Sequence, residues 1–445
     1  MRRLHSLLAL CALALPAAAS TTAWTYTPPA SGTKGTISWT DSSGFENIMN
    51  GAVLSDGLIT FATGLNTGNA NLKNLDLTVP VYAADGTTQY AFSPHALGDA
   101  TASGRVVSGA YLTNVVLHTD CKSVGRYAFK ACTALVKVTL NDGLEVIHED
   151  AFRDDTALAT IDNFFPDSLK QIGVYAFNKC SAMSGSAVAN GLERIGNRAF
   201  QYCSSLRGFD CGASTLAQVE AATFYKDTAL ESVVLPNTVT NIQTGAFWTC
   251  TSLTSFSPLL PPALQTLGAS SGDPPFLDCP IEGHVVSPHT LTNLCPRAFR
   301  GARIETFTSP MKGLRSIGEY AFSGCTFLTN IVLSSDLESL TGSWVKGTTA
   351  AGGVHVWFRN LPASLPSNVW GETKTQNITA HLPLSKEAEW REWVASAPAG
   401  HTFTFNMQTE TLPEHPNDVG TWKAGYTQNV TWYKDSDAPT LVLIK

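Results

Sequence analysis

The residues that could perform covalent chemistry are few and poorly placed in this sequence. Gly268-Ala269-Ser270-Ser271-Gly272 fits the Gly-x-Ser-x-Gly pattern, in which a nucleophilic serine sits between a strand and a helix. Asp273-Pro274-Pro275 follows at once, and prolines cannot donate the backbone hydrogen bonds that such a helix needs. A hydrolase centred on Ser270 is therefore the weakest of the functional hypotheses.

Histidines and carboxylates form no convincing metal or catalytic set. His284 and His289 could be two metal ligands, but no third ligand is near them in the sequence, so we interpret them as loop residues. His148-Glu149-Asp150 takes the place that Gly-x-Tyr holds elsewhere in a repeat, which makes it a sequence variant of that repeat. We predict no catalytic residue, no metal ligand and no cofactor.

Charge and cysteine content exclude two further classes of protein. The chain has 29 Lys and Arg against 36 Asp and Glu, a net charge of −7, with no basic block that could follow a phosphate backbone. Its 10 cysteines contain no Cys-x-x-Cys pair, which argues against structural zinc and against a redox couple. We therefore predict no nucleic-acid partner.

The start of the chain predicts export. Arg2 and Arg3 precede an apolar run from Leu7 to Leu15, and small residues end at Ala19, as in a secretory signal peptide. We assign residues 1–19 to this peptide, with cleavage as late as residue 23 as the alternative. No later run reaches the ~18 apolar residues of a membrane-spanning helix. The expected location is secreted or at the cell surface, without a transmembrane span.

A repeat of about 23 residues runs through the middle of the chain. Nine phenylalanines follow a small residue or a proline or threonine at spacings of 23 to 29 residues: Phe129, Phe152, Phe177, Phe200, Phe224, Phe247, Phe276, Phe299 and Phe322. Three residues after six of them stands a cysteine: Cys132, Cys180, Cys203, Cys250, Cys279 and Cys325. A unit this short cannot bury its own apolar residues, so the units must stack on one another.

Within each unit, the pattern predicts one short strand and a tight return. Endings such as Val138 to Leu140 alternate like a strand that is buried on one face. The segment around each phenylalanine is too short for a full helix and predicts a turn leading into a 3₁₀ or short helical coil. The segment Tyr90 to Phe92 echoes this signature and is a candidate degenerate unit.

The stretch Ile317-Gly-Glu-Tyr-Ala-Phe-Ser-Gly-Cys-Thr-Phe-Leu-Thr-Asn-Ile-Val-Leu333 closely resembles the BspA-like leucine-rich repeat of bacterial surface proteins. The resemblance covers residues 107–345. It implies an α/β repeat solenoid of about nine units, with short parallel strands and turn, 3₁₀ or short helical returns. It also implies secretion or surface display and a role in adhesion or macromolecular binding, with no shared catalytic residues.

The cysteine position in the repeat predicts packed thiols. Side chains on successive units point the same way, which suits packing better than the ~90° torsion of a disulfide. Asp155 and Asp227 occupy the same position, and we expect each to accept a backbone N–H at its turn. Any disulfide would more readily involve the cysteines outside the repeat position, Cys121, Cys211 and Cys295.

The outward positions of the predicted strands are small and nearly uncharged. They include Ala187 and two acids, Asp162 and Asp210, which lie two units apart and so about 10 Å from each other. This separation is too large for the two carboxylates of a glycosidase. The aromatic side chains that could anchor a ligand are concentrated elsewhere, because seven of the ten tryptophans follow residue 340: Trp344, Trp357, Trp370, Trp390, Trp393, Trp422 and Trp432.

The flanking segments complete the predicted organisation. Residues 20–106 are expected to be a β-rich N-terminal cap, and 346–400 the solenoid end with a C-terminal cap. We expect Val354 to Phe358 to be the final strand, and a short amphipathic helix between His381 and Trp393. Residues 401–445 are expected to form a small β-unit or tail. The tryptophans would seal the last unit, or Trp422 and Trp432 would stack on sugar rings.

The leading functional hypothesis is an exported, non-catalytic leucine-rich repeat protein that mediates macromolecular binding or adhesion at the cell surface. Its partners would be protein or glycan macromolecules of a host or of the cell envelope. The alternative hypothesis is a carbohydrate-binding or envelope structural protein that uses the tryptophan-rich C-terminal region.

Overall fold

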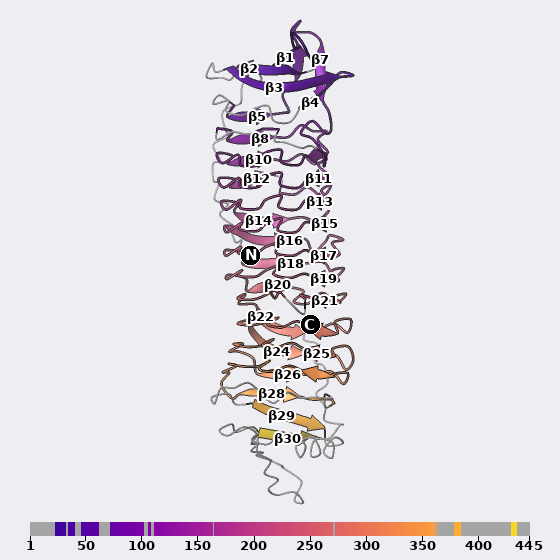
Figure 1. Ribbon diagram of the computed structural model, residues 1–445, viewed down its shortest axis with the longest axis vertical. Coiled ribbons are helices and arrows are strands. Elements are labelled where there is room, and N and C mark those ends of the chain that lie inside the picture. The colour runs from indigo at the N-terminus through magenta and orange to yellow at the C-terminus, as the bar shows by residue number, and fades with distance from the viewer. Residues whose placement is uncertain are drawn as a thin grey trace, which may run out of the picture.

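The computed structural model describes residues 23–32, 34–40, 46–61, 72–101, 106–107, 111–162, 164–269, 272–360, 362, 378–383 and 429–433. These residues form a tall stack of coils, a β-solenoid of about 11 turns (Figure 1). The stacked parallel strands expected from the repeat are therefore present.

One side of the solenoid, called here the long-strand side, is a ladder of parallel strands. Its strands are β5 (Asn74–Asp76), β8 (Asn114–Val116), β10 (Lys137–Thr139), β12 (Thr160–Asp162), β14 (Gly185–Val188), β16 (Leu206–Asp210), β18 (Ser232–Val234), β20 (Ser255–Ser257), β22 (Glu282–Val286), β24 (Arg303–Thr308), β26 (Asn330–Val332), β28 (Val354–Trp357), β29 (Ile378–Pro383) and β30 (Asn429–Tyr433). Equivalent residues pair from coil to coil, as in Val115↔Val138↔Ile161. In the three-residue strands, such as β10 and β12, the central residue is buried, because alternate side chains point to opposite faces.

A second ladder, the short-strand side, is made of two-residue strands. They are β9 (Ser123–Val124), β11 (Val146–Ile147), β13 (Gln171–Ile172), β15 (Arg194–Ile195), β17 (Gln218–Val219), β19 (Asn241–Ile242), β21 (Thr266–Leu267), β23 (Asn293–Leu294), β25 (Ser316–Ile317) and β27 (Ser339–Leu340). An aliphatic residue stands five positions before eight of the nine phenylalanines, and each one, such as Ile147, ends its strand and is buried.

The return between a short strand and the next long strand is a turn and not a helix. None of the described residues lies in an α- or 3₁₀-helix, so the helical part of the expected α/β architecture is not found there. The physical reason is that these backbone N–H groups donate to the neighbouring coil: the N–H of Phe129 donates to the carbonyl of Ala151 at 2.8 Å, and that of Phe152 to Ala176 at 2.8 Å. The described part of the chain accordingly contains no helix that could cross a membrane.

Six strands of the leading segment close into a small barrel in the order β1-β2-β3-β4-β7-β6, at one end of the solenoid (Figure 1). They are β1 (Trp24–Thr27), β2 (Gly35–Thr40), β3 (Glu46–Ser55), β4 (Leu58–Phe61), β6 (Val81–Ala83) and β7 (Gln89–Phe92). The segment Tyr90 to Phe92 lies in β7 of this barrel, so it is not a solenoid unit. Parallel stacking nevertheless begins within residues 20–106, because β5 pairs with β8 and Leu97 bridges Val124.

At the other end, the solenoid continues beyond the expected last strand. The strand predicted at Val354 to Phe358 is present as β28, but it is not the edge, because β29 and β30 pair in parallel after it. His381 to Pro383, expected to begin a helix, are the end of β29. The remainder of that predicted helix, and of the predicted unit at 401–445 apart from β30, lies outside the described residues.

Candidate binding surface

The third side of the solenoid, the turn edge, is built from an eight-residue turn that recurs in every coil, as in residues 125–132. The column phenylalanine at its centre points inward. In eight of the nine coils the residues two before and two after it both adopt positive φ, and in the coil of Phe276 only Asp278 does. In the coil of Phe129 these are Tyr127 (φ 61°) and Ala131 (φ 58°), and in the coil of Phe200 they are Arg198 (φ 56°) and Tyr202 (φ 64°). This left-handed conformation costs an L residue ~1–2 kcal/mol and usually selects glycine.

Inside the turn edge, the nine column phenylalanines stack on one another. All are buried, and the ring centroids of successive members lie 5.2–5.9 Å apart with interplanar angles of 3–12°. The tenth coil places Val345 at this position and Trp344 one residue earlier, since the N–H of Phe322 donates to the carbonyl of Trp344. Trp344 is buried and meets Phe322 edge-on. It does not close the stack, because β28 to β30 lie beyond it.

The repeat cysteines are buried beside this column as free thiols. The thiol of Cys203 donates to the carbonyl of Phe177 at 3.1 Å, and that of Cys250 to the carbonyl of Phe224 at 3.0 Å. The same bond to the preceding coil recurs at Cys180, Cys279 and Cys325, whereas Cys132 bonds Val107. Cys121, Cys211 and Cys295 are also free and buried. The thiols therefore connect one coil to the next through hydrogen bonds and not through disulfides.

The two aspartates in the cysteine position accept backbone N–H groups, but from the preceding coil and not from their own turn as predicted. Oδ1 of Asp155 accepts from the N–H of Cys132 at 2.7 Å, and Oδ1 of Asp227 accepts from the N–H of Cys203 at 2.8 Å. Burial raises the pKa of the Asp227 carboxyl well above its ordinary value of 3.8, because the charged form loses its water. Burial likewise raises the pKa of the Cys211 thiol to about 12, so this sulfur remains a thiol at neutral pH.

The outside of the turn edge carries aromatic and basic side chains. Six of them form what we call the central patch: Tyr175, Arg198, Tyr202, Tyr225, Lys226 and Trp248. The rings of Tyr202 and Tyr225 lie 5.6 Å apart at 87°, and those of Tyr225 and Trp248 lie 5.1 Å apart at 66°. Three successive coils therefore each contribute one aromatic ring to a continuous row.

The basic residues of the central patch are held by these rings. Nη1 of Arg198 donates to the hydroxyl of Tyr175 at 2.6 Å. Nζ of Lys226 lies 5.7 Å from the ring centre of Tyr202 and 5.3 Å from that of Tyr225. Such contacts orient the cations through the negative ring face and leave their charge uncancelled.

The earlier coils carry basic side chains at neighbouring positions of the same turn, with their charge neutralised. Arg126 pairs with Glu149 at 3.0 Å, and Lys130 pairs with Asp150 at 3.1 Å. Asp150 also accepts an ion pair from Arg153 at 3.2 Å. Among the ion pairs of the described residues, none involves Arg198 or Lys226, so the positive charge of the turn edge is open at the central patch.

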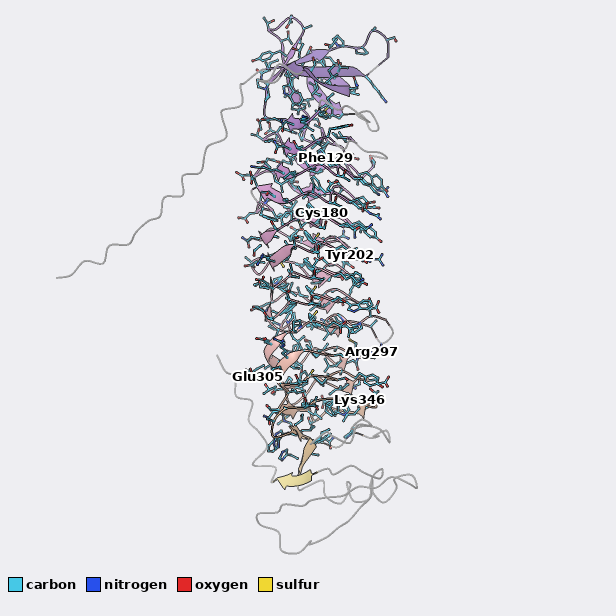
Figure 2. All side chains as sticks on the ribbon, turned by 90° about the vertical axis from the view of Figure 1, so that its left-hand side faces the viewer. Phe129, Cys180, Tyr202, Arg297, Glu305 and Lys346 are labelled. Carbon is cyan, nitrogen blue, oxygen red and sulfur yellow. The ribbon has the colours of Figure 1, made fainter. Side chains whose placement is uncertain are left out.

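A shallow hollow of about 380 Å³ lies beside the central patch. It is lined by the ring of Tyr202, by Lys179 and by the hydroxyl-bearing residues Thr156, Ser181 and Ser204. Further along the same edge, Arg297 and Lys346 each lie 5.9 Å from the ring of Tyr320. Figure 2 shows Tyr202, Arg297 and Lys346 along one edge of the stack, with Glu305 on the opposite side.

The two strand ladders, by contrast, carry balanced charge pairs. On the long-strand side Lys137 pairs with Asp162, and Arg207 pairs with Glu231 at 3.0 Å. On the short-strand side Lys122 pairs with Glu145 at 2.8 Å. One expected outward residue is misplaced: Ala187 is buried, because a register shift between Gly185 and Ser186 turns Ser186 outward instead. These two sides offer less uncompensated charge than the turn edge.

The other residues singled out in the sequence do not come together. Nδ1 of His284 hydrogen-bonds Oγ1 of Thr306 at 3.0 Å and its Nε2 lies 3.6 Å from Glu305, so its partners are on β24 and not at His289. No group of three His, Cys, Asp or Glu able to hold a metal occurs within the described residues. Ser270 lies outside them.

The tryptophan-rich end is only partly described. Trp357 stacks on His381 with ring centroids 3.7 Å apart, and His381 in turn hydrogen-bonds His355 at 2.8 Å. Trp422 lies outside the described residues, and Trp432 belongs to β30, whose side chains are not described. The described tryptophans at this end thus contact other protein side chains.

The aromatic row was not predicted from the sequence, because the sequence pattern indicated the tryptophans after residue 340 as the aromatic side chains that could anchor a ligand. The available signal was the alignment of each unit on its phenylalanine, which places Tyr202 and Lys226 at one position and Tyr225 and Trp248 at another. A second set of buried rings, such as Phe209 and Phe307, was not predicted either; they pack against the column at 5.0 and 4.9 Å.

Comparison with known proteins agrees with the repeat pattern. A family model described as BspA type Leucine rich repeat region matches the chain in six copies, over residues 107–226, 172–282 and 272–351. These ranges together span more than half of the 445 residues. A search of the curated proteins finds no match to this chain.

Several solved structures are also similar to parts of the chain. A leucine-rich repeat protein from Bacteroides ovatus is 19% identical, covering 76% of this chain and 94% of that one, with a TM-score of 0.46. The T. pallidum leucine-rich repeat protein is 27% identical, covering 48% and 77%, with a TM-score of 0.26. A leucine-rich cell surface protein from Faecalibacterium prausnitzii is 18% identical, covering 80% and 96%, with a TM-score of 0.33.

Proposed function

The chain belongs to the BspA-type leucine-rich repeat family, and from this premise we propose that it is an exported, non-catalytic protein that binds macromolecules at the cell surface. The observation that carries the proposal is the turn edge. There, large aromatic and basic side chains such as Arg198 and Tyr202 occupy backbone positions that favour glycine. Later coils do use glycine at the second position, at Gly301, Gly324 and Gly347, so the fold does not require these side chains.

The non-catalytic part of the proposal is supported by the state of the reactive groups. The nine described thiols are buried, and burial holds the pKa values of Cys180, Cys203 and Cys250 far above neutrality. A thiol that stays protonated and inaccessible is a poor nucleophile. The proposal of export is supported by the leader pattern of residues 1–19.

Binding is tested by adding the fluorescently labelled mature chain to intact bacteria and to epithelial cells, and measuring bound label by flow cytometry. The variant Arg198→Ala/Tyr202→Ala/Lys226→Ala should bind about tenfold less, because it removes the open cations and one ring. The matched control Lys137→Ala/Thr160→Ala/Arg207→Ala removes the same number of positive charges from the long-strand side and should bind like the wild type. Equal binding by all three proteins would contradict the proposal.

Export has its own test. The full chain, expressed with its leader in a bacterium, should be recovered outside the cytoplasm with Ser20 as its first residue, or a residue no later than Trp24. An intact Met1 in the recovered protein would contradict the assignment of the leader.

A further inference from the structure

We propose that the central patch binds a linear polyanionic glycan, one bearing uronate or sulfate groups, that runs along the solenoid axis. This inference rests on the proposed binding function and names the class of ligand for the same surface. Its basis is the combination of open cations, one aromatic ring per coil and an adjoining hollow that includes Thr156, Ser181 and Ser204.

The charge of the patch selects an anionic partner. In the coil that carries Lys226, Asp227 is buried and Glu231 pairs with Arg207 on the long-strand side. Glu220 keeps its charge, but it follows the short strand β17 and accepts hydrogen bonds from Gln218 and Gln243. The side-chain hydrogen bond of Arg198 goes to the neutral hydroxyl of Tyr175. On a chain with a net charge of −7, this is a local surplus of positive charge, and an anionic group on the ligand would complete its pairing.

The spacing of the rings selects a polymer. Tyr202, Tyr225 and Trp248 come from three consecutive coils, whose strands repeat every ~4.8 Å. One sugar unit of an extended polysaccharide is of similar length, so each unit can meet one coil. Aromatic rings present apolar faces and edges on which the C–H face of a sugar packs.

The hollow beside the patch combines a mostly apolar lining with hydroxyl-bearing residues, as a sugar combines C–H faces with hydroxyl groups. Its walls include Thr156, Ser181 and Ser204, together with Lys179, whose Nζ lies 3.4 Å from Asp154. Hydroxyls both donate and accept hydrogen bonds, which matches the hydroxyl groups of a glycan. Tyr202 forms one wall and is 36% exposed, so the row of rings and the hollow are contiguous.

An acidic peptide fits this edge less well. One common mode of peptide binding pairs the peptide backbone with an exposed strand edge. Here the backbone N–H groups at the patch already donate to the next coil, as Arg198 does to Ala221, Tyr202 to Tyr225 and Lys226 to Trp248. Side chains on one face of an extended peptide also recur every ~7 Å, which does not match the rise per coil.

The experiment measures binding of the full mature chain by surface plasmon resonance to five immobilised polymers: polygalacturonate, heparin, neutral dextran, poly-L-glutamate and oligo-dT. We expect binding to polygalacturonate or heparin, none to dextran, and weakening as salt rises, since the contacts are exposed to solvent. The charge-only variant Arg198→Gln/Lys226→Gln and the ring variant Tyr202→Ala/Trp248→Ala should each lose about tenfold in affinity. The control Lys137→Gln/Arg207→Gln should bind like the wild type.

Three results would overturn the inference: no binding to either anionic glycan, equal or tighter binding to poly-L-glutamate or oligo-dT, or glycan binding that neither patch variant weakens. A melting curve for each variant shows that it is folded, and the charge-only variant removes no ring from the row. If the patch variant loses binding to cells while no glycan binds, the glycan inference fails and the proposed function stands. If binding to cells ignores the patch, the proposed function itself fails.

Discussion

The inner and outer sides of the eight-residue turn differ in how much their residues vary from coil to coil. Its inner side is almost invariant along the array, with a phenylalanine at the same position in nine coils and nearly parallel rings throughout. Its outer side changes from coil to coil, with Tyr127, Asp150, Tyr175 and Arg198 at one equivalent position. The outer rings also meet edge-on, at 87° and 66°.

This contrast separates the side chains that the fold requires from those that it tolerates. A stacked column gains from burying identical rings in register, so each coil is constrained by both of its neighbours. The outer positions gain nothing from the left-handed backbone they occupy, yet most keep a side chain. We infer that the inner side sets stability and the outer side sets binding, and the predictions below are chosen to separate the two.

The largest expected effect is on the inner side. Phe200→Ala removes a fully buried ring that stacks on Phe177 and Phe224 at 5.3 and 5.5 Å, and should lower the free energy of unfolding by ~3–5 kcal/mol. Phe327, which is 53% exposed, provides a matched control, and Phe327→Ala should change stability by less than ~0.5 kcal/mol. Thermal and denaturant melts followed by circular dichroism measure both. An unchanged melt for Phe200→Ala would refute the structural role of the column.

The phenylalanine column and the stacking could be predicted because the phenylalanines keep a nearly constant spacing although the residues between them vary. The returns could not be predicted from the same pattern. A short turn around Phe129 suggests a helical coil in isolation, but its N–H groups donate to Ala151 and its neighbours in the next coil, a partner that a single unit does not reveal.

The binding surface was harder to predict for a related reason. Tyr202, Tyr225 and Trp248 look like unrelated substitutions in three units, and only the coil register shows that their rings form one row. The end of the solenoid was misplaced because Trp344 departs from the phenylalanine signature. The coil nevertheless keeps its backbone bond to Phe322, and Val345 holds the column position.

A second prediction concerns Asp227, one of the two buried aspartates that take the place of a repeat cysteine. Asp227 has a folded-state pKa well above 3.8, so the folded chain keeps a proton that the unfolded chain releases as the pH rises. The stabilisation from the protonated Asp227 carboxyl is fully present below its unfolded pKa, near 3.8, and is lost as the pH rises toward the raised folded-state pKa. Asp227→Asn cannot ionise and retains an oxygen for the N–H of Cys203.

We therefore expect Asp227→Asn to be more stable than the wild type by ~1–3 kcal/mol at pH 7, and the difference to shrink toward pH 4. Denaturant melts of both proteins between pH 4 and pH 8 measure this difference. Asp162→Asn, on the exposed long-strand side, serves as the control and should show no comparable rise. A difference that grows toward acid pH would mean that Asp227 is stabilised as a carboxylate, contrary to its burial.

The smallest expected effect tests the premise that outer side chains persist against a backbone cost. Ala222 has a φ of 53°, and Ala222→Gly should raise the free energy of unfolding by ~0.5–1 kcal/mol, since glycine adopts this conformation without steric penalty. Ala229 lies in the same coil at a residue without positive φ, so Ala229→Gly should instead lower stability by a similar amount, through the entropy of the unfolded chain. Denaturant melts measure both variants. Changes of opposite sign in the free energy of unfolding, from the same Ala→Gly exchange at two positions of one coil, isolate the cost of positive φ. If both variants were destabilised equally, residues such as Tyr202 would carry no backbone penalty, and their presence on the turn edge would no longer indicate selection for binding.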